Sequence, residues 1–497
     1  MSSSPDTPVA APAAVDPHHE RRWLILVVVG IAQLMVVLDA TITNIALPSA
    51  QADLGFSDGS RQWVITAYAL AFGSLLLLGG RLGDLLGRKR VFVVGLLGFA
   101  TASAVGGAAG SFGVLVGARA AQGVFAALLA PAALGLLSTT FTDPAERAKA
   151  FGVFGAIAGA GAGIGMLLGG VLTDLLSWRW SLYVNLLFAI PAATAAVRLL
   201  HGTRAGSLRG RIDVPGTLTA TAGLLALVYG FSHAESDGWG NGLTVAMLAA
   251  AAVLLVSFVL VERRSDKPLL PLSVVTDRAR ASAYLSFGLA GAAMFAVFLF
   301  MTFYLQRTLG FSPLETGFAF LPLNLVIIAT ATTVSTRILP RTGPRPLVPT
   351  GMLLGAASML WFTGLDVDGG YAGHILPGLL VMGVGMGLIF APAMATATLG
   401  VAPQHAGVAS AMVSTGQQVG GAVGTALLST LAASATSGYV DGRVPSQQVL
   451  AEAAVHGYTT AFWWAAGIFL LGAAVSAALL PRRAAAQAPV GEPVLAH

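Results

Sequence analysis

Apolar residues form fourteen long stretches in this chain, and that pattern limits the possible folds more than any other feature of the sequence. Each stretch has about 20 to 26 residues, and a helix of about 20 mostly apolar residues crosses the hydrocarbon core of a bilayer. Only 10% of the residues are charged, against about 25% in a soluble protein. The sequence therefore predicts an all-α polytopic membrane protein with fourteen transmembrane helices. They begin near residues 24, 62, 91, 112, 150, 181, 214, 243, 282, 314, 347, 372, 408 and 458.

The positions of the basic residues predict the orientation of these helices. If Arg21 and Arg22 lie inside, the inside loops hold 22 Lys and Arg residues, the outside loops hold four, and one lies within a helix. This asymmetry follows the positive-inside rule. We therefore expect the chain in the cytoplasmic (inner) membrane with both termini in the cytoplasm. The net charge of +5 is explained by this topology and does not indicate nucleic-acid binding, and the absence of cysteine excludes disulfides.

Two parts of the chain resemble each other at a constant offset of 261 residues. The offset pairs small residues and prolines: Gly155, Gly159, Gly163 and Pro131 with Gly416, Gly420, Gly424 and Pro392. Parallel repeats of six helices are a transporter architecture in which the substrate binds between the halves. The predicted segments are a disordered cytoplasmic tail (1–20), an N-terminal six-helix bundle (21–200), a linker with two inserted transmembrane helices (201–281), a C-terminal six-helix bundle (282–481) and a second cytoplasmic tail (482–497).

One acid and one base lie within the apolar stretches. Asp39 occurs in VVLDATITNIALP, eight residues before Leu47, and Arg119 occurs in RAAQGVFAALLAP, seven residues after Phe112. At 1.5 Å per residue, both side chains lie about 11–12 Å below the outer boundary of the bilayer. Ionisable residues at such depth are expensive and are functional by default. Asp39 can bind and release a proton, while Arg119 keeps its charge. The alternative is a static buried pair that orients two helices.

Neutral polar residues extend this predicted site. Thr43 lies one helical turn from Asp39, and Gln122 lies one turn from Arg119, so both are expected to line a cavity. Asn44 either lines the cavity or bonds a neighbouring helix, and Tyr68 either stacks on a flat ligand or packs. The complete set of predicted cavity residues is Gln33, Thr43, Asn44, Tyr68, Gln122, Asn185, Asn324 and Gln417.

Two glycine-rich motifs complete the pattern. GRLGDLLGRKR lies in the predicted cytoplasmic loop after the second helix and contains Gly80, Gly83, Asp84, Gly87, Arg88, Lys89 and Arg90. GAIAGAGAGIGMLLGGVL lies in the fifth helix and contains Gly155, Gly159, Gly163, Gly165, Gly169 and Gly170. Small residues at every fourth position allow two helices to approach closely. The fifth helix is therefore expected to form a tight surface that seals the cavity between the halves.

These four motifs together resemble the major facilitator superfamily, and specifically its fourteen-helix drug:proton antiporter family. The resemblance implies alternating access driven by the proton gradient without any other cofactor. It implies that Asp39 and Arg119 couple transport to protons, that the loop motif braces one conformation, and that the fifth helix prevents proton leak. The chain departs from the family pattern at three places, with Met166, Pro340 and Leu380 where a proline, a second loop aspartate and a second arginine are expected.

We therefore expect a proton-coupled antiporter that exports amphipathic drugs or antibiotics, with a small amphipathic substrate, protons and membrane lipids as its partners and a monomeric state. No metal-spaced histidine cluster or nucleotide motif occurs, and GFSDG (55–59) lies in a short loop that cannot form a nucleophile elbow. The sequence leaves open an exporter of an endogenous lipid or secondary metabolite and, less in keeping with the pattern, a proton-coupled importer of a polar nutrient. A sensor that transports nothing would not need an intramembrane proton carrier.

Overall fold

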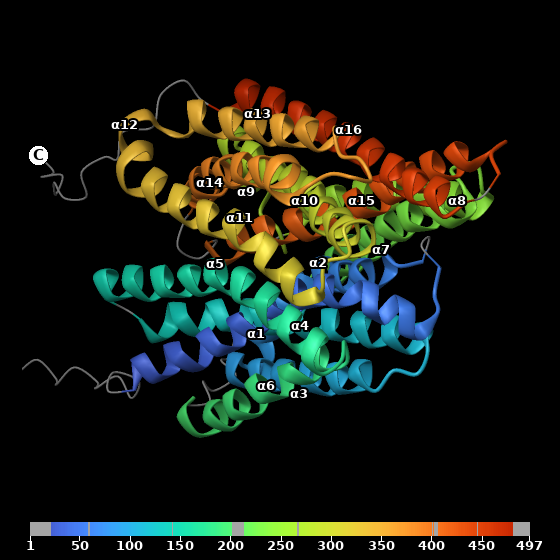
Figure 1. The fold of residues 1–497 in the computed structure, drawn as a ribbon. Helices are drawn as coiled ribbons and strands as arrows, with labels where there is room; N and C mark the ends of the chain where they lie inside the picture. Colours follow the sequence, from blue (N-terminus) through green and yellow to red (C-terminus); the bar gives the residue numbers. More distant parts are fainter. Residues whose placement is uncertain are drawn as a thin grey trace, which may run out of the picture.

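The computed structural model describes residues 21–57, 60–141, 143–200, 213–265, 268–399, 401, 406–444 and 446–480. These residues are helical throughout, apart from turns and short connections, and contain no strand, as the sequence predicts. Figure 1 shows two helical bundles, one above the other. The lower, N-terminal bundle comprises α1 (Arg22–Leu54), α2 (Trp63–Leu86), α3 (Arg88–Gly107), α4 (Phe112–Thr140), α5 (Pro144–Leu175) and α6 (Trp180–Leu199).

The upper, C-terminal bundle has the same number of long helical segments, and three of them include a π-helical turn (η). It comprises α10 (Arg278–Phe303) with η1 (Tyr304–Thr308), α11 (Pro313–Thr333) with η2 (Val334–Ile338) and α12 (Leu339–Thr342), α13 (Pro344–Phe362), η3 (Tyr371–Ile375) with α14 (Leu376–Thr398), α15 (Ala406–Val440) and α16 (Gln447–Leu479). The short helix α9 (Leu272–Val275) precedes α10. Fully buried aromatic rings, including Phe300, Phe303 and Phe462, form the centre of this bundle.

Eleven helices of the described part are long and apolar enough to cross a membrane. Shorter apolar stretches, Trp63–Leu76 and Gly163–Leu175, occur in α2 and α5. The prediction of a helical, many-span membrane protein is therefore confirmed, while the number fourteen and the predicted segment boundaries stay predictions. We call the end of the molecule at which α1 ends and α2 begins the Arg61 end, and the opposite end the Arg22 end.

The two bundles meet along two seams, and small residues allow the close approach. At the first seam, a Cβ atom on Gly170 of α5 would lie 2.7 Å from the Cα atom of Leu314 in α11. At the second, a Cβ atom on Gly73 of α2 would lie 3.2 Å from the Cβ atom of Gln418 in α15. Toward the Arg22 end, the ribbons of α5 and α11 diverge (Figure 1).

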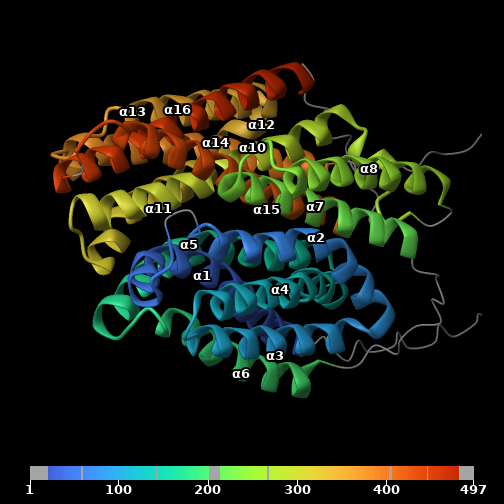
Figure 2. The same cartoon turned by 90° about the vertical axis from the view of Figure 1, so that its right-hand side faces the viewer.

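The inserted hairpin consists of α7 (Val214–Asp237) and α8 (Gly242–Arg264). The first helix of this hairpin, α7, packs over the α2–α15 seam. Val228 of α7 forms a buried cluster with Ala69 of α2 and Ala422 of α15, and the Thr221 hydroxyl donates a hydrogen bond to the Ser74 carbonyl oxygen (3.3 Å). Figure 2 shows α7 beside α2 and α15, with α8 farther out. Therefore α7 contacts both bundles.

Candidate functional site: a buried ion pair in the N-terminal bundle

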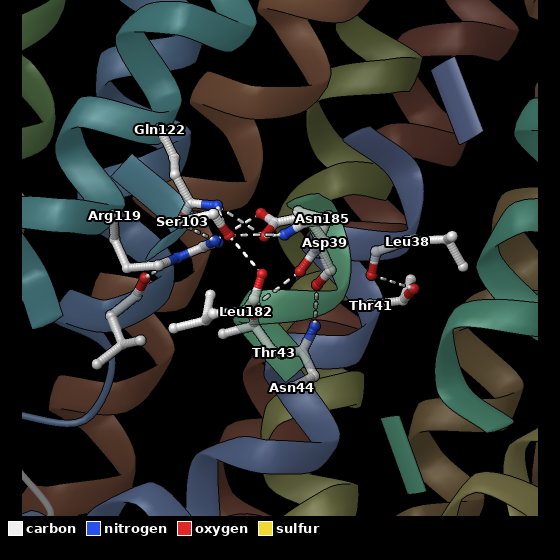
Figure 3. A network of polar contacts seen from close by, with 12 residues as sticks. Leu38, Asp39, Thr41, Thr43, Asn44, Ser103, Arg119, Gln122, Leu182 and Asn185 are labelled. Atoms are coloured by element: carbon white, nitrogen blue, oxygen red, sulfur yellow. Dashed lines mark hydrogen bonds and ion pairs between the residues drawn. The ribbon is translucent and has the colours of Figure 1, made fainter. Parts of the chain in front are cut away.

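Asp39 and Arg119 form a salt bridge inside the N-terminal bundle (Figure 3). The distance from Arg119 Nη1 to Asp39 Oδ2 is 2.5 Å, and the side chains are 0% and 2% exposed for Asp39 and Arg119. Removing two charges from water costs several kcal/mol per ion, and their attraction offsets this cost only when further hydrogen bonds satisfy both groups. The surroundings of the pair supply such bonds.

The second carboxylate oxygen of Asp39 accepts two amide hydrogen bonds. Gln122 Nε2 donates to Oδ1 at 2.8 Å, and Asn185 Nδ2 donates to the same atom at 2.7 Å. Both amide nitrogens also donate to Ser103 Oγ, at 3.1 and 2.9 Å, and this hydroxyl donates to the Leu182 carbonyl oxygen at 2.7 Å. The side chains of the site thus come from four helices, α1, α3, α4 and α6 (Figure 3). Sequence reasoning missed Ser103, whose only signal is a hydroxyl in a largely apolar helix.

Arg119 is held from three further directions. Its Nε donates to the Val64 carbonyl oxygen at 3.1 Å, and Nη1 donates to Gln122 Oε1 at 3.0 Å. The guanidinium carbon lies 4.5 Å from the centre of the Tyr68 ring, within the range of a cation–π interaction. The guanidinium group can therefore remain bound if Asp39 loses its charge. Tyr68, predicted as a cavity residue, is buried and belongs to this cluster.

The carboxylate of Asp39 points into its own bundle and not toward the other bundle. Its side-chain partners among the described residues lie on α4 and α6, and α5 packs against the face of α1 that carries Leu38 and Ile42. We expected Asp39 to face a cavity between the halves, and the structure differs from that expectation. Thr43 is in the same region, with Oγ1 donating to the Asp39 backbone oxygen at 2.8 Å.

The other predicted cavity residues are dispersed. Asn44 Nδ2 donates to the Ala40 carbonyl oxygen of its own helix (2.9 Å), which is neither of the two predicted roles. Asn324 lies at the α5–α11 seam, where Nδ2 bonds the Phe320 carbonyl oxygen (3.0 Å) and contacts Met166 Sδ (3.6 Å). Met166, which replaces the expected proline, therefore contributes to the contact between the bundles. Gln33 and Gln417 are partly exposed, and neither joins the ion-pair cluster.

The loop motif braces the Arg22 end of the N-terminal bundle. Arg88 Nη1 donates to the Gly135 carbonyl oxygen of α4 (2.7 Å), and Lys89 Nζ donates to the Val197 carbonyl oxygen of α6 (2.8 Å). Gly87 separates α2 from α3 at φ 92°, a conformation that favours glycine. Of the other motif positions, Gly80 and Gly83 lie in α2 and Arg90 is exposed, while the side chain of Asp84 lies outside the described part.

The glycines of the fifth-helix motif serve two different interfaces. Cβ atoms on Gly165 and Gly169 would lie 3.2 and 3.0 Å from Cα atoms of α1, so these two glycines fit α5 against α1 within one bundle. Gly170 and Gly163 instead face α11 of the other bundle. The surroundings of Gly155 and Gly159 lie outside the described residues. The described part of the predicted seal therefore consists of Gly163 and Gly170.

A contact between the bundles that sequence reasoning missed lies at the Arg61 end. Arg61 precedes α2 and is 7% exposed, with its guanidinium carbon 4.1 Å from the Phe303 ring centre and 5.9 Å from those of Phe300 and Tyr458. We call these three rings of α10 and α16 the aromatic cage. Nearby, Gln306 Nε2 donates to the Ile45 carbonyl oxygen of α1 at 3.1 Å. From the sequence, Arg61 counted only as an outside charge.

The chain is similar in sequence and in fold to known transport and resistance proteins. A sequence model of the Major Facilitator Superfamily matches residues 29–425. The puromycin resistance protein pur8 of Streptomyces alboniger is 50% identical over 99% of this chain and 98% of its own length. The cephamycin export protein CmcT of Amycolatopsis lactamdurans is 39% identical over 93% of each chain. In fold, the chain is similar to an autoinhibited peptide transporter of the POT family, with a TM-score of 0.67, 15% identity, and coverage of 93% of this chain and 97% of that one.

Proposed function

Because this chain belongs to the major facilitator superfamily, we propose that it is a proton-coupled antiporter that exports amphipathic, antibiotic-like compounds by alternating access. Family membership makes it a membrane transporter and not an enzyme. The proposal includes a monomer with fourteen spans in the cytoplasmic membrane. It also places both termini in the cytoplasm, so that the Arg61 end faces outward.

The observation that carries the proposal is the buried pair of Asp39 and Arg119. A carboxylate at 0% exposure can bind a proton, and doing so removes its attraction for the adjacent guanidinium group. Binding and release of one proton would thereby change the forces that hold α1 and α4 together. This is the property that a proton-driven conformational change requires.

The pair has no equivalent in the C-terminal bundle. At the repeat offset of 261 residues, Phe300 takes the place of Asp39 and Leu380 takes the place of Arg119. Phe300 is fully buried in the apolar core. A transporter that recognised a polar nutrient would need charged or paired polar groups in both halves, so this asymmetry favours an apolar or amphipathic substrate over a nutrient importer.

The contacts at the Arg61 end support alternating access. Arg61 crosses from the N-terminal bundle into the aromatic cage of the C-terminal bundle, and Gln306 crosses in the other direction. A substrate that leaves at this end requires both contacts to break. The structure thus has the features of a state that is closed at the Arg61 end.

The α2–α15 seam is built in a way that favours opening. Gly73 of α2 lies opposite Gln418 of α15, and Ala69 clusters with Ala422. Because α2 and α15 run antiparallel, this alignment places Thr66 at the same level as Thr425. Both hydroxyl groups are fully buried and have no hydrogen-bond partner among the described residues. A buried unpaired polar group costs about 1–3 kcal/mol, and water removes that cost when the seam opens. The closed seam is therefore less stable than its tight packing suggests.

The substrate class rests on the relatives. Their names include puromycin, cephamycin, tetracenomycin C and lincomycin, which are chemically diverse antibiotics. The relative with 50% identity over 99% of this chain bears the name of puromycin. We therefore propose antibiotics as the substrate class, and puromycin as the first compound to test.

The test is export of puromycin by the purified full chain in proteoliposomes under an imposed pH gradient. Asp39→Asn should abolish accumulation against the puromycin gradient, since an amide cannot titrate, while the protein still folds and binds puromycin. Asp441→Asn, at an exposed position of the same chain, is the matched control and should leave accumulation unchanged. Uphill export by Asp39→Asn at the wild-type rate would refute the proton-coupling assignment. Failure of the wild-type protein to move puromycin would refute the substrate assignment.

A further inference from the structure

A small cavity lies beside Arg119, on the side of the ion pair that faces the Arg61 end. Its volume is about 10 Å³, which is room for about one water molecule. Three polar side chains, Thr43, Ser181 and Arg119, line it. The rest of the lining is Ala46, Leu47, Ala50, Val64, Leu115, Trp178 and Leu182. All these residues belong to the N-terminal bundle or the loop that precedes α6, so the cavity is not part of either seam.

The lining of the cavity extends from Arg119 toward the Arg61 end. Ala50 lines its outer part and lies seven residues beyond Thr43, which is about 10 Å along α1. Trp178 also lines it, and its indole Nε1 donates to Asp53 Oδ2 at 2.9 Å. The Asp53 side chain is 47% exposed at the Arg61 end. An exposed carboxylate, which is also paired with Arg179, therefore lies one side chain away from the cavity.

The polar lining suits a water molecule, which needs two to four hydrogen-bond partners. Thr43 Oγ1 uses its proton for the Asp39 backbone oxygen and retains lone pairs for a donor. Ser181 Oγ lies 3.2 Å from Thr173 Oγ1, so the two hydroxyl groups form a buried pair at the edge of the cavity. Arg119 supplies N–H donors from the inner side.

Arg119 separates this cavity from the carboxylate. Asp39 does not line the cavity, and its Oδ2 atom is covered by Arg119 Nη1. Its Oδ1 atom is covered by two amide groups. A proton that arrives in the cavity can therefore reach Oδ2 only when the guanidinium group moves aside. The Val64 carbonyl oxygen, Gln122 Oε1 and the Tyr68 ring already contact the guanidinium group and remain to hold it when the ion pair opens.

We propose that protons from the Arg61 end reach Asp39 through this cavity, with Arg119 as the gate, by a route inside the N-terminal bundle that is separate from the substrate route between the bundles. The proposal rests on the proposed proton-coupled function. In the transfer step, a hydronium ion in the cavity gives its proton to Asp39 Oδ2, which leaves water and a neutral carboxylic acid. The Arg119 guanidinium keeps its charge, loses its ion pair and stays held by its other contacts. Tyr68 acts as a positioning residue for the displaced guanidinium.

Three substitutions test the route in proteoliposomes loaded with a pH-sensitive dye and supplied with puromycin. Thr43→Val and Ser181→Ala remove a hydroxyl with little change of shape, and Ala46→Val adds bulk to the cavity wall. Each should lower the maximal rate of puromycin-driven proton movement about tenfold with KM within about twofold, which corresponds to about 1.4 kcal/mol of barrier. Proton transfer should also become rate-limiting, so the rate ratio between H₂O and D₂O should rise. Ala32→Val, at a buried α1 position away from the cavity, is the matched control and should change neither quantity.

The outcomes separate this route from the proposed function. If Asp39→Asn abolishes proton movement while Thr43→Val, Ser181→Ala and Ala46→Val retain wild-type rates and isotope ratios, the route is wrong and the function stands. If Ala32→Val slows proton movement as much as Ala46→Val does, the effect is one of packing and the route is also wrong. If the wild-type protein moves no protons with puromycin, although it transports puromycin, the coupled function and the route fall together.

Discussion

Arg61 should control how often the Arg61 end opens, and the structure gives the size of the effect. Arg61→Ala removes a guanidinium group that is 7% exposed and 4.1 Å from the Phe303 ring centre. A desolvated cation–π interaction contributes about 2 kcal/mol. Because every 1.4 kcal/mol changes an equilibrium constant tenfold, the open population should rise about 30-fold. The second partner, Phe303→Leu, keeps an apolar side chain but removes the ring and should raise the open population by a similar but smaller factor.

The absence of cysteine from the chain makes the assay direct. Thr425→Cys introduces a thiol into the α2–α15 seam at a position that is 0% exposed in the closed state. A membrane-impermeant maleimide added from outside reacts with this thiol only when the seam opens, so the labelling rate follows the open population when opening is fast. In this background, Arg61→Ala should label about 30-fold faster than the parent.

Two controls make the result specific. Arg443 stacks on Tyr439 within the C-terminal bundle, at the same end, with a distance of 3.7 Å, so Arg443→Ala removes a similar contact that does not cross between bundles. It should leave labelling unchanged. A double-mutant cycle of Arg61→Ala with Phe303→Leu should show non-additivity, since each change removes the same contact. Unchanged labelling in Arg61→Ala, or equal acceleration by Arg443→Ala, would refute the reasoning.

Three further predictions concern the ion pair, the seal and the substrate. Arg119→Leu leaves the Asp39 carboxylate buried without its counter-charge and should destabilise the protein by about 3–5 kcal/mol, measured as a lower Tm. The double variant Asp39→Asn with Arg119→Leu should recover part of this loss. An Arg119→Leu protein as stable as wild type would argue against a buried charged pair. Gly170→Ala should abolish puromycin export because its Cβ atom would lie 2.7 Å from the Leu314 Cα atom. The nearest contact of a Cβ atom at Gly163 is 3.5 Å, so Gly163→Ala should export puromycin normally. Equal export by the two variants would contradict the assigned seal. In resistance assays with matched monocationic and dicationic quaternary ammonium compounds, the monocations should be exported better, because Asp39 faces its own bundle with its charge offset by Arg119 and an uncompensated buried charge is costly; equal protection against dications would show that an acid reaches the substrate.

Much of the helical framework could be predicted from the sequence, because membrane insertion depends on linear pattern. A run of about 20 apolar residues is enough to form a spanning helix, whatever its neighbours are. Asp39 and Arg119 could be placed at one depth by counting residues from the helix ends. The salt bridge between them then requires only that α1 and α4 be neighbours. Glycine at 87 likewise marks the break between α2 and α3, because local backbone geometry needs it.

The direction in which each side chain points was decided only by the tertiary structure. Gly165 and Gly169 let α5 approach one face of α1, and the remaining face, which carries Asp39, is left to pack against α4 and α6. The sequence gives the position of Asp39 along α1 but cannot say which helices surround it, so the carboxylate was expected between the halves.

The partners of Arg61 also could not be predicted from the sequence. Its sequence neighbours mark it as an outside charge, while its partners, Phe300, Phe303 and Tyr458, are more than two hundred residues away in the chain. Apolar periodicity is a local property and determines which segments enter the membrane. The rotation of each helix about its axis, and the partner that it meets, depend on close packing between segments that are distant in sequence, so only the assembled bundles fix them.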